Sequence, residues 1–233
     1  MKDVKISIIT PCLNSAKTIR QTIESVLNQT YQDIEYIIVD GASTDGTLEI
    51  IQEYEDQFQG RMQYVSEPDN GIYDAMNKGI RMSHGNVIGI INSDDFYEED
   101  AVDNVVMHLG REKYQVIYGY CKMFDGCHCA GILRRSHRNL PQEMIPHPTC
   151  FLTRSIYKKF GLFLESFKIA GDYELMLRLY LSDRVKFVQI NRVIANFRMG
   201  GISSFSKQLK RERAWILFRY KFISFLKMIE QMV

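Results

Sequence analysis

Residues 36–47 (YIIVDGASTDGT) join a short apolar run to an acidic turn that contains glycine. Residues 87–95 (VIGIINSDD) repeat this design further along the chain. Short β-branched runs of this kind are typical of buried strands, and open α/β sheets bind ligands at the carboxyl ends of their strands. We therefore expect both acidic turns at one edge of one sheet. Adjacent carboxylates repel each other there unless a positive charge shares the site, and a divalent cation with a phosphorylated ligand fits this need.

The first half of the chain alternates strand-like and helix-like segments, which is typical of parallel βαβ units with right-handed crossovers. We predict an α/β fold with a Rossmann-like, mostly parallel central sheet flanked by helices. Ser15 is expected to cap the first helix. The expected strands are residues 5–10, 35–40, 62–66, 86–92 and 115–120, and the expected helices are residues 15–29, 47–54, 71–82 and 100–109.

The second half loses this alternation. Residues 121–139 are polar and rich in turn formers, so we expect a hairpin or a loop over the sheet. We predict one domain, residues 1–205, and a C-terminal helical appendage, residues 206–233. Helices are expected at residues 153–160, 171–182 and from about 206 to the end, and strands at 185–190 and 193–197.

Composition and charge exclude several classes of protein. The chain has 233 residues, of which 45% are hydrophobic and 24% charged, as in ordinary globular proteins. Its net charge of +1 argues against nucleic acid as a partner. No apolar run approaches the roughly 18 residues of a membrane span. The five cysteines and the lack of a signal-peptide pattern lead us to expect reduced thiols in a cytoplasmic protein.

Two common nucleotide-binding motifs are absent. Gly41 and Gly46 have the spacing of a P-loop, but Thr47 and Leu48 stand where Lys and Ser/Thr are required. Residues 10–14 replace the Gly-x-Gly-x-x-Gly of a dinucleotide site. The polar tip of this first turn remains suited to lining a nucleotide pocket.

The acids after the second and third strands have two interpretations each. Asp40 is placed to accept hydrogen bonds from a nucleobase or a ribose; capping the next helix is the alternative, and Asp45 suits that role well. Asp69 and Asp74 either border the same edge of the sheet or belong to a loop with a capped helix. For Asp74 and Lys78, an ion pair one helical turn apart is the alternative.

Asp94 and Asp95 give the strongest local signal, because two acids in sequence after a buried strand point to opposite sides of the chain. One can hold a metal while the other binds a ribose or sugar hydroxyl. Mg²⁺ and Mn²⁺ prefer such oxygen ligands and usually keep some waters and substrate phosphates. The alternative is a pair that caps the next helix, although residues 98–100 already supply acids there.

Three further features are ambiguous from the residues alone. Asp172 opens a helix, where acids are often caps. His147 lies between two prolines and is either a metal or phosphate contact or part of a surface loop. Residues 127–129 (CHC) lack the paired Cys-x-x-Cys spacing of structural zinc sites, which disfavours zinc.

Taken together, these blocks resemble the inverting family 2 glycosyltransferases with the GT-A fold. The Asn-Ser-Asp-Asp ending is similar to the bacterial enzymes that build colanic acid, O-antigen and capsular polysaccharide. The resemblance covers about residues 4–205, and the matching blocks are residues 8–14, 39–47, 69–79, 89–95 and 169–174.

The resemblance implies a nucleotide-sugar donor, in particular a UDP-sugar, a glycan or polyprenyl-diphosphate-linked acceptor, and Mn²⁺ or Mg²⁺. It also implies roles for individual residues. Two departures are Gly41, where many members have a second acid, and Asn92, which replaces the first acid of the Asp-x-Asp triplet. The implied roles are base contact for Asp40, base pocket for Pro11 and Asn14, donor binding for Ser43, Asp69, Asp74, Lys78 and Asp94, metal binding for Asp95, general base for Asp172, a metal, diphosphate or acceptor contact for His147, and the acceptor side for Tyr173 and Glu174.

The C-terminal segment is basic and amphipathic. Residues 207–221 contain six basic residues and one acid, and an apolar stripe follows helical spacing. This pattern fits an interfacial membrane helix and, equally well, a helix packed on the catalytic domain or on a second copy in a homodimer. The lipid-linked acceptor that the resemblance implies favours contact with a membrane, at the inner face of the bacterial cytoplasmic membrane. The stripe consists of Trp215, Phe218, Phe222, Phe225 and Ile229.

Two other functions compete with sugar transfer. A nucleotidyltransferase also uses an α/β sheet with a metal-binding acid, but residues 11–14 supply no glycine-rich loop with Lys or Arg. A non-catalytic nucleotide-sugar binding module is disfavoured by the intact Asp94, Asp95 and Asp172. We therefore expect a metal-assisted, single-displacement glycosyltransferase of surface polysaccharide synthesis.

Overall fold

The computed structural model describes residues 4–200 and 207–232. Its strands are β1 (Ile6–Cys12), β2 (Ile34–Asp40), β3 (Met62–Ser66), β4 (Val87–Ile90), β5 (Phe96–Tyr97), β6 (Gln115–Asp125), β7 (His128–Leu133), β8 (Phe151–Thr153) and β9 (Lys186–Arg198). Its α-helices are α1 (Ile19–Leu27), α2 (Thr47–Tyr54), α3 (Ile72–Met82), α4 (Ala101–His108), α5 (Arg154–Phe160), α6 (Gly171–Leu181), α7 (Lys207–Arg219) and α8 (Phe225–Met232). Short 3₁₀ turns lie at Asp56–Phe58, His137–Asn139 and His147–Thr149.

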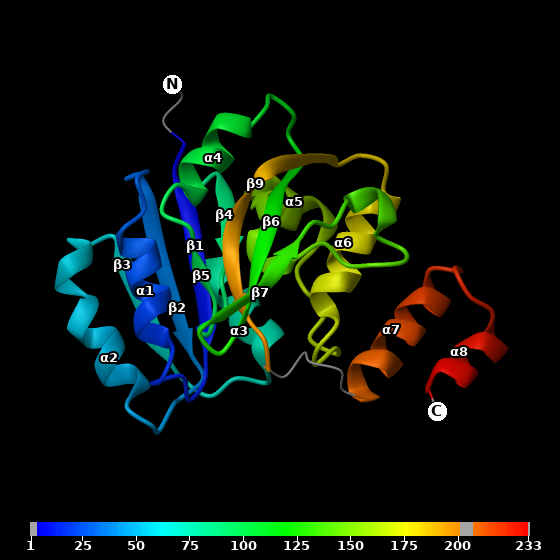
Figure 1. Ribbon diagram of the computed structural model, residues 1–233, viewed down its shortest axis with the longest axis horizontal. Coiled ribbons are helices and arrows are strands. Elements are labelled where there is room, and N and C mark those ends of the chain that lie inside the picture. The colour runs from blue at the N-terminus through cyan, green and yellow to red at the C-terminus, as the bar shows by residue number, and fades with distance from the viewer. Residues whose placement is uncertain (1–3, 201–206, 233) are drawn as a thin grey trace.

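One sheet runs through the described residues in the order β3-β2-β1-β4-β8-β6-β9-β5, with β7 paired to β6 (Figure 1). β1 pairs in parallel with β2 and β4, and β2 with β3, as predicted for the first half. The buried β-branched runs explain this, because every residue of β1, β2 and β4 is buried. Alternate side chains enter two separate cores: Ile6 and Ile8 pack on the side of α1, and Ile9 and Ile37 on the side of α3.

The second half makes the sheet mixed. β8 lies antiparallel between β4 and β6, β5 is antiparallel to β9, and β6 is parallel to β9. The predicted hairpin is confirmed as β6 and β7. The α/β fold with flanking helices is thus confirmed, and the antiparallel pairs fall where the sequence loses its alternation.

Two strands expected at residues 185–190 and 193–197 are in fact one, β9. The pairing with β6 shifts here, since Tyr118 lies opposite Gln189 and Tyr120 opposite Val193. β9 therefore bulges without ending. Gly119 makes room for this bulge, because a Cβ at Gly119 would lie 2.7 Å from the carbonyl oxygen of Arg192.

The C-terminal segment forms a helical hairpin and not the single helix expected. α7 ends at Arg219, Lys221 has a left-handed φ of 63°, and α8 begins at Phe225. Phe218 and Phe225 hold the two helices together, with ring centroids 5.8 Å apart. Figure 1 shows this hairpin at the opposite end of the molecule from α2. The expected boundary between residues 205 and 206 lies outside the described residues.

No helix within residues 4–200 and 207–232 has both the length and the apolar character needed to cross a bilayer.

The first helix, α1, starts later than expected, because Ser15 is not its N-cap. The carbonyl of Ser15 accepts hydrogen bonds from the backbone N–H groups of Thr18 and Ile19, so residues 15–18 form a turn ahead of α1.

Glu35 is a buried acid on β2 and ties three segments together. Its Oε1 accepts hydrogen bonds from Ser7 Oγ at 2.5 Å, from Gly85 N at 2.9 Å and from His84 N. Burial alone would raise the pKa of Glu35, but these hydrogen bonds lower it below its ordinary value. A depressed pKa in the folded state means that the ionised form stabilises the fold above the unfolded pKa, and that this is lost as pH falls through the folded pKa.

We expect Glu35→Gln to lower the free energy of unfolding at pH 7 by about 2 kcal/mol, because the charged acceptor of three hydrogen bonds becomes neutral. The variant should also lose less stability than the wild type on acidification. Urea unfolding at pH 7 and pH 4 measures both effects. Glu53→Gln, which removes only a surface ion pair with Arg20, is the control and should change stability by less than about 0.5 kcal/mol. Equal stability of Glu35→Gln and wild type at pH 7 would contradict this role.

Candidate functional site

The turns after β1 and β2 are joined by hydrogen bonds at the carboxyl edge of the sheet. Asn14 has a left-handed φ of 50°. Its Oδ1 accepts a hydrogen bond from Thr44 N at 2.9 Å, and its backbone N–H donates one to Ser43 Oγ at 2.7 Å. Pro11 is buried on β1 opposite Val39. In Figure 1 β1 runs downward from the N-terminus, so this edge is the lower one. Asn14 and Ser43 are thus in direct contact, and the roles of Pro11 and Asn14 in a base pocket and of Ser43 in donor binding stay predictions.

Asp45 has a structural role, as the capping alternative suggested. Its Oδ1 accepts from Thr47 N at 3.1 Å and from Thr47 Oγ1 at 2.5 Å, and its Oδ2 accepts from Ala16 N at 3.0 Å. These hydrogen bonds, Thr47 Oγ1 first, lower the pKa of Asp45. The carboxylate thus fixes the start of α2 against the turn before α1.

Asp40 is fully buried, and donors from its own chain occupy both of its oxygens. Oδ2 accepts from Ser43 N at 3.0 Å and from Ser66 Oγ at 2.6 Å, while Oδ1 accepts from Ser43 Oγ and from Cys12 Sγ. Asp40 therefore lies beneath the turn after β2 and fixes Ser43 through these hydrogen bonds. Its contact with a base stays a prediction.

Gly41 leaves space for the carboxylate of Asp69. A Cβ at Gly41 would lie 2.6 Å from Asp69 Oδ2 and 3.3 Å from Leu13 Cδ1. The absence of a side chain therefore brings the Asp69 carboxylate against the turn after β2. Asp69 also accepts a hydrogen bond from Gly71 N at 2.8 Å, which fixes the start of α3.

Asp74 and Lys78 form the local ion pair that the sequence offered as an alternative, with 3.6 Å between Asp74 Oδ2 and Lys78 Nζ. Asp74 Oδ2 also accepts from Asn70 N at 3.0 Å, and Lys78 Nζ donates to Pro68 O at 3.1 Å. Hydrogen bonding to Glu67, followed by the charge of Asp74, raises the pKa of Lys78. The two residues brace the loop that carries Asp69.

The turn after β4 joins the same edge, because Ser15 Oγ and Ser93 Oγ are 2.7 Å apart. Asp95 is fully buried; its Oδ1 accepts from Arg198 N at 3.1 Å, and its Oδ2 has no hydrogen-bond partner in the described part of the chain. Asn92 Oδ1 is buried without a partner in the same sense. Burial, followed by the charge of Asp94, raises the pKa of Asp95 well above its ordinary value, and burial raises that of Asp94.

Two buried oxygens without donors, Asp95 Oδ2 and Asn92 Oδ1, in a turn that also carries Asp94 fit a hard divalent cation, which prefers oxygen ligands. The described residues contain no group of three His, Cys, Asp or Glu side chains able to hold a metal by themselves. A cation here would therefore take its remaining ligands from water and phosphate, as Mg²⁺ and Mn²⁺ usually do.

Arg198 is a part of this turn that the sequence did not reveal. Its backbone N–H binds Asp95, its Nη1 donates to Asp94 O at 2.5 Å, and its charge opposes the rise in the pKa of both acids. Its position at the end of β9 is remote in sequence, and no local pattern marks it.

Asp172 lies in the first turn of α6 and contacts α3. Its Oδ1 accepts from Tyr73 Oη at 3.2 Å and from Tyr173 N at 2.9 Å, and its own N–H donates to Tyr73 Oη at 3.3 Å. Tyr73 is buried, and a Cβ at Gly171 would lie 2.8 Å from its ring, so glycine permits the contact. Tyr73 was missed as a site residue, although it lies within the block 69–79.

His147 lies on the Asp172 side of the fold and is buried. Its ring meets Phe163 edge to face, with centroids 5.9 Å apart. Burial lowers the pKa of His147, and the charge of Asp172 acts in the opposite direction. The roles of His147 as a metal, diphosphate or acceptor contact stay predictions.

Tyr173 and Glu174 face the interior and not an open acceptor side, which corrects their expected position. Tyr173 Oη donates to Pro141 O at 3.0 Å. Glu174 is fully buried; it pairs with Arg178 at 3.0 Å and accepts from Tyr220 Oη at 2.6 Å. Tyr173 is one residue and Glu174 two residues after Asp172, so each side chain leaves α6 in a different direction from that of Asp172.

The charges of Asp95 and Asp172 each raise the pKa of a buried cysteine. Burial raises the pKa of Cys121 to about 12, and the charge of Asp95 adds to the rise. Burial also raises the pKa of Cys150, and both Asp172 and Cys121 act on it in the same direction.

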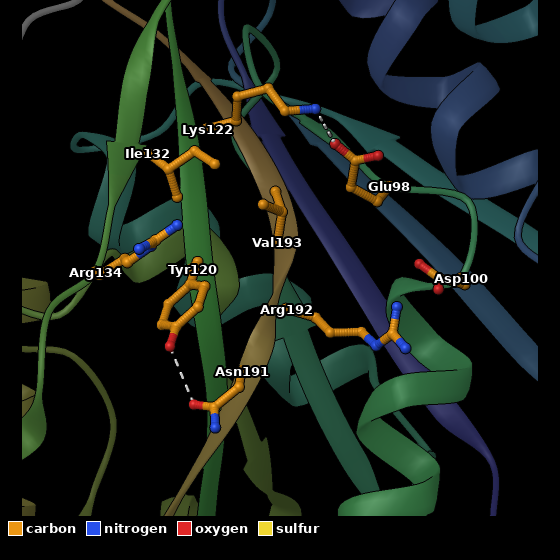
Figure 2. Close-up of a pocket in the computed structure, with 9 residues that line it drawn as sticks. All are labelled: Glu98, Asp100, Tyr120, Lys122, Ile132, Arg134, Asn191, Arg192 and Val193. Carbon is orange, nitrogen blue, oxygen red and sulfur yellow. Dashed lines mark hydrogen bonds and ion pairs between the residues drawn. The ribbon is translucent and has the colours of Figure 1, made fainter.

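A cavity of about 490 Å³ lies on another part of the sheet (Figure 2). Lys122 pairs there with Glu98 at 2.8 Å, and Tyr120 Oη donates to Asn191 Oδ1 at 3.1 Å. None of the residues predicted for the site is among those that line it. The predicted site residues and this cavity are therefore separate features of the described structure.

Comparison with known proteins identifies the family. The sequence pattern described as "Glycosyl transferase family 2" matches residues 7–161, which is more than half of the 233 residues. The chain belongs to glycosyl transferase family 2. It is therefore a glycosyltransferase, and nucleotidyl transfer loses its support as an alternative.

Curated relatives of this family 2 glycosyltransferase carry names that refer to sugar transfer or polysaccharide synthesis. The "PGL/p-HBAD biosynthesis glycosyltransferase" of Mycobacterium bovis is 28% identical over 201 residues, which cover 85% of this chain and 78% of the relative. The chondroitin synthase of Escherichia coli is 32% identical over 213 residues, which cover 88% of this chain and 30% of the synthase. The chain therefore spans less than a third of that synthase.

Solved structures confirm the GT-A fold. S. aureus TarS 1–349, in complex with UDP-GlcNAc, superposes with a TM-score of 0.73 at 19% identity, over 92% of this chain and 66% of that one. The mannosyltransferase PcManGT of Pyrobaculum calidifontis, in complex with GDP-Man and Mn²⁺, gives 0.71 at 15% identity, over 95% and 65%. Of the full TarS chain, this protein spans 40%. At such identities the similarity establishes the fold alone.

Proposed function

We propose that this family 2 glycosyltransferase moves a sugar from a nucleoside-diphosphate donor to a hydroxyl of a glycan or lipid-linked acceptor, with inversion at the sugar carbon. One observation carries the proposal. Hydrogen bonds join the turns after β1, β2 and β4, the Asp69 carboxylate lies against Gly41, and Tyr73 at the start of α3 contacts Asp172; these contacts support one shared edge for Asp69, Asp94, Asp95 and Asp172.

The N-terminal part of this edge is suited to the nucleotide. Asn14, Ser43 and Asp69 offer polar atoms at the ends of three adjacent strands, where α/β folds bind ligands. Asp40 would act there mainly by holding Ser43, and Asp74 and Lys78 by holding the Asp69 loop. A UDP-sugar is our preferred donor, and the UDP-GlcNAc complex of S. aureus TarS supports this choice by its shared fold.

Asp95, Asp94 and Asn92 would hold Mn²⁺ or Mg²⁺, since their oxygens include two buried acceptors without donors. A bound divalent cation would neutralise negative charge on the leaving diphosphate. The PcManGT complex with Mn²⁺ supports this cofactor by analogy of fold. Arg198 would keep Asp95 oriented through its backbone N–H.

Asp172 would act as general base. A sugar hydroxyl is a weak nucleophile until its proton is removed during attack, and a carboxylate at hydrogen-bond distance can accept that proton. Tyr73 holds one oxygen of Asp172 in place at 3.2 Å, which leaves the other oxygen for the acceptor. An acceptor that attacks from the Asp172 side, opposite the departing diphosphate, gives a single displacement and an inverted product. His147 would border this side.

The acceptor is proposed to belong to a surface polysaccharide and to be presented at a membrane. The names of the mycobacterial relative and of chondroitin synthase are consistent with a glycan or glycolipid product. The C-terminal hairpin supports the membrane, because its outer face exposes apolar side chains next to basic ones. Exposed fractions are 57% for Phe225, 80% for Leu226 and 45% for Ile229.

The proposed reaction is tested with a panel of UDP-, GDP- and dTDP-sugars, with Mn²⁺ and with glycan or polyprenyl-diphosphate-sugar acceptors. We expect release of the nucleoside diphosphate from one UDP-sugar, which an acceptor accelerates, and a product with the inverted anomeric configuration by NMR. A product that retains the donor's configuration would contradict the roles given to Asp172 and the edge.

Membrane binding is tested with the double substitution Leu226→Asp and Ile229→Asp, which leaves the contact between Phe218 and Phe225 intact. The full chain should co-sediment with vesicles rich in phosphatidylglycerol and less so at high salt, because basic side chains contribute to the attraction. The double variant should lose at least ten-fold in binding while donor hydrolysis stays unchanged. Met107→Asp, at an equally exposed apolar position on α4, is the control. If the wild-type chain does not bind vesicles and forms a dimer instead, the exposed face of α8 contacts a second copy of the chain and not a membrane.

A further inference from the structure

Glu212 on α7 is a buried acid that binds the backbone just ahead of α6. Its Oε1 accepts from Lys168 N at 2.9 Å, and its Oε2 accepts from Ile169 N at 2.9 Å and Ala170 N at 2.8 Å. Gln208 Nε2 donates to the same carboxylate at 2.7 Å. An acid that collects successive backbone N–H groups at a helix start is well placed electrostatically.

The bound segment, residues 168–170, leads directly into α6, and Asp172 follows two residues after Ala170. The peptide of Ile169 is held on both sides, since its N–H goes to Glu212 and its carbonyl accepts from Tyr73 Oη at 2.6 Å. Tyr73 in turn contacts the Asp172 carboxylate. Residues 168–170 are thus held by hydrogen bonds to Tyr73 of α3 and Glu212 of α7. These hydrogen bonds fix the position of the first residues of α6.

The same segment also contacts the donor side of the edge. Lys168 Nζ donates to Asn70 O at 2.9 Å, next to Asp69. A displacement of residues 168–170 would therefore change the position of Asp172 relative to the loop that carries Asp69.

α7 lies beside the lower end of α6 (Figure 1), and its side chains contact residues on both sides of Asp172. Trp215 meets Phe167 with ring centroids 5.6 Å apart, and the guanidinium of Arg213 lies 5.5 Å from the ring centroid of Tyr173. Tyr220 closes the contact through its hydrogen bond to Glu174. The hairpin is therefore built into the wall of the site and is not a detached appendage.

We propose that Glu212 is a positioning residue for the transfer reaction: from the C-terminal hairpin it fixes residues 168–170 and so holds the Asp172 carboxylate in place. This rests on the proposed role of Asp172 as base. It makes α7 part of the catalytic apparatus, while the exposed side chains of α8 stay available for docking.

The test uses Glu212→Ala and Glu212→Gln in the full chain. A shift of about 1 Å in a reacting group can cost 10²-fold in rate. We expect Glu212→Ala to lower kcat about 100-fold and Glu212→Gln by less, because the amide keeps one acceptor oxygen. The KM for the donor and the Kd for UDP should change less than two-fold. Glu230→Gln, an exposed acid on α8, is the matched control and should leave kcat unchanged.

Calorimetric titration with UDP counts the folded sites in each preparation, so kcat is expressed per competent site. A purely structural Glu212 would lower the melting temperature and the number of sites but leave kcat per site at the wild-type value, and that result would overturn the proposal. If Asp172→Asn is also fully active, the proposed base is wrong; if Asp172→Asn is inactive while Glu212→Ala keeps its kcat per site, only the positioning role fails.

Discussion

Asp172→Asn should lower kcat for transfer by about 10³-fold, the scale of a lost general base. The amide has the same shape, and it can still accept the hydrogen bond from Tyr73 Oη, so the start of α6 should keep its structure. What it loses is the capacity to accept a proton from the acceptor hydroxyl. Steady-state transfer assays at saturating donor measure the effect.

The nucleotide should bind this variant nearly as well as the wild type, because Asn14, Ser43 and Asp69 are untouched. Asp183→Asn, an exposed acid just after α6 with a left-handed φ of 52°, is the control, and an asparagine tolerates that conformation well. Wild-type turnover in Asp172→Asn would refute the assignment of the base.

Asp95→Asn should lower transfer by about 10²–10³-fold, since charge neutralisation at the leaving group is worth several kcal/mol. The Oδ1 that accepts from Arg198 N remains available, so the turn should persist. The Oδ2 without a partner becomes an NH₂ group, which repels a cation and cannot act as its ligand. Loss of the carboxylate also relieves the repulsion with Asp94.

The readout independent of turnover is the effect of Mn²⁺ on UDP affinity. Mn²⁺ should tighten UDP binding to the wild type and have little effect on Asp95→Asn. Asp125→Asn, an exposed acid at the end of β6, serves as control. If wild type and Asp95→Asn respond equally to Mn²⁺, or if a chelator leaves transfer unchanged, the cation does not belong at this turn.

The fold was predictable where short buried strands alternate with amphipathic helices. Residues 36–39 and 87–91 are apolar enough to be buried on both faces, which is typical of central strands and places Asp40 and Asp95 just beyond the ends of these runs. The helical hairpin was not predictable in this way, since the apolar spacing of Trp215, Phe218, Phe222 and Phe225 continues across the break. Backbone conformation at Lys221, and not side-chain pattern, ends α7.

The site was predictable where a role depends on local chemistry. Asp74 and Lys78 form the local ion pair that the sequence offered, and Asp45 accepts a hydrogen bond from the first backbone N–H of α2, although the N-cap itself is Gly46; these interactions span two to four residues. Tyr73, Arg198 and Glu212 were missed because their contacts with the site span many residues along the chain. Tyr173 and Glu174 were misplaced because adjacency to Asp172 in sequence does not determine which face of a helix meets the core.

Calorimetric titration of the full chain with UDP, with and without Mn²⁺, tests the central claim most directly. If the acidic turns share one edge that receives a nucleoside diphosphate, one UDP should bind per chain, Mn²⁺ should strengthen the binding, and Asp69→Ala should weaken it. A chain that binds no UDP under either condition, or binds it equally well after Asp69→Ala and Asp95→Asn together, would show that these carboxylates do not form a donor site.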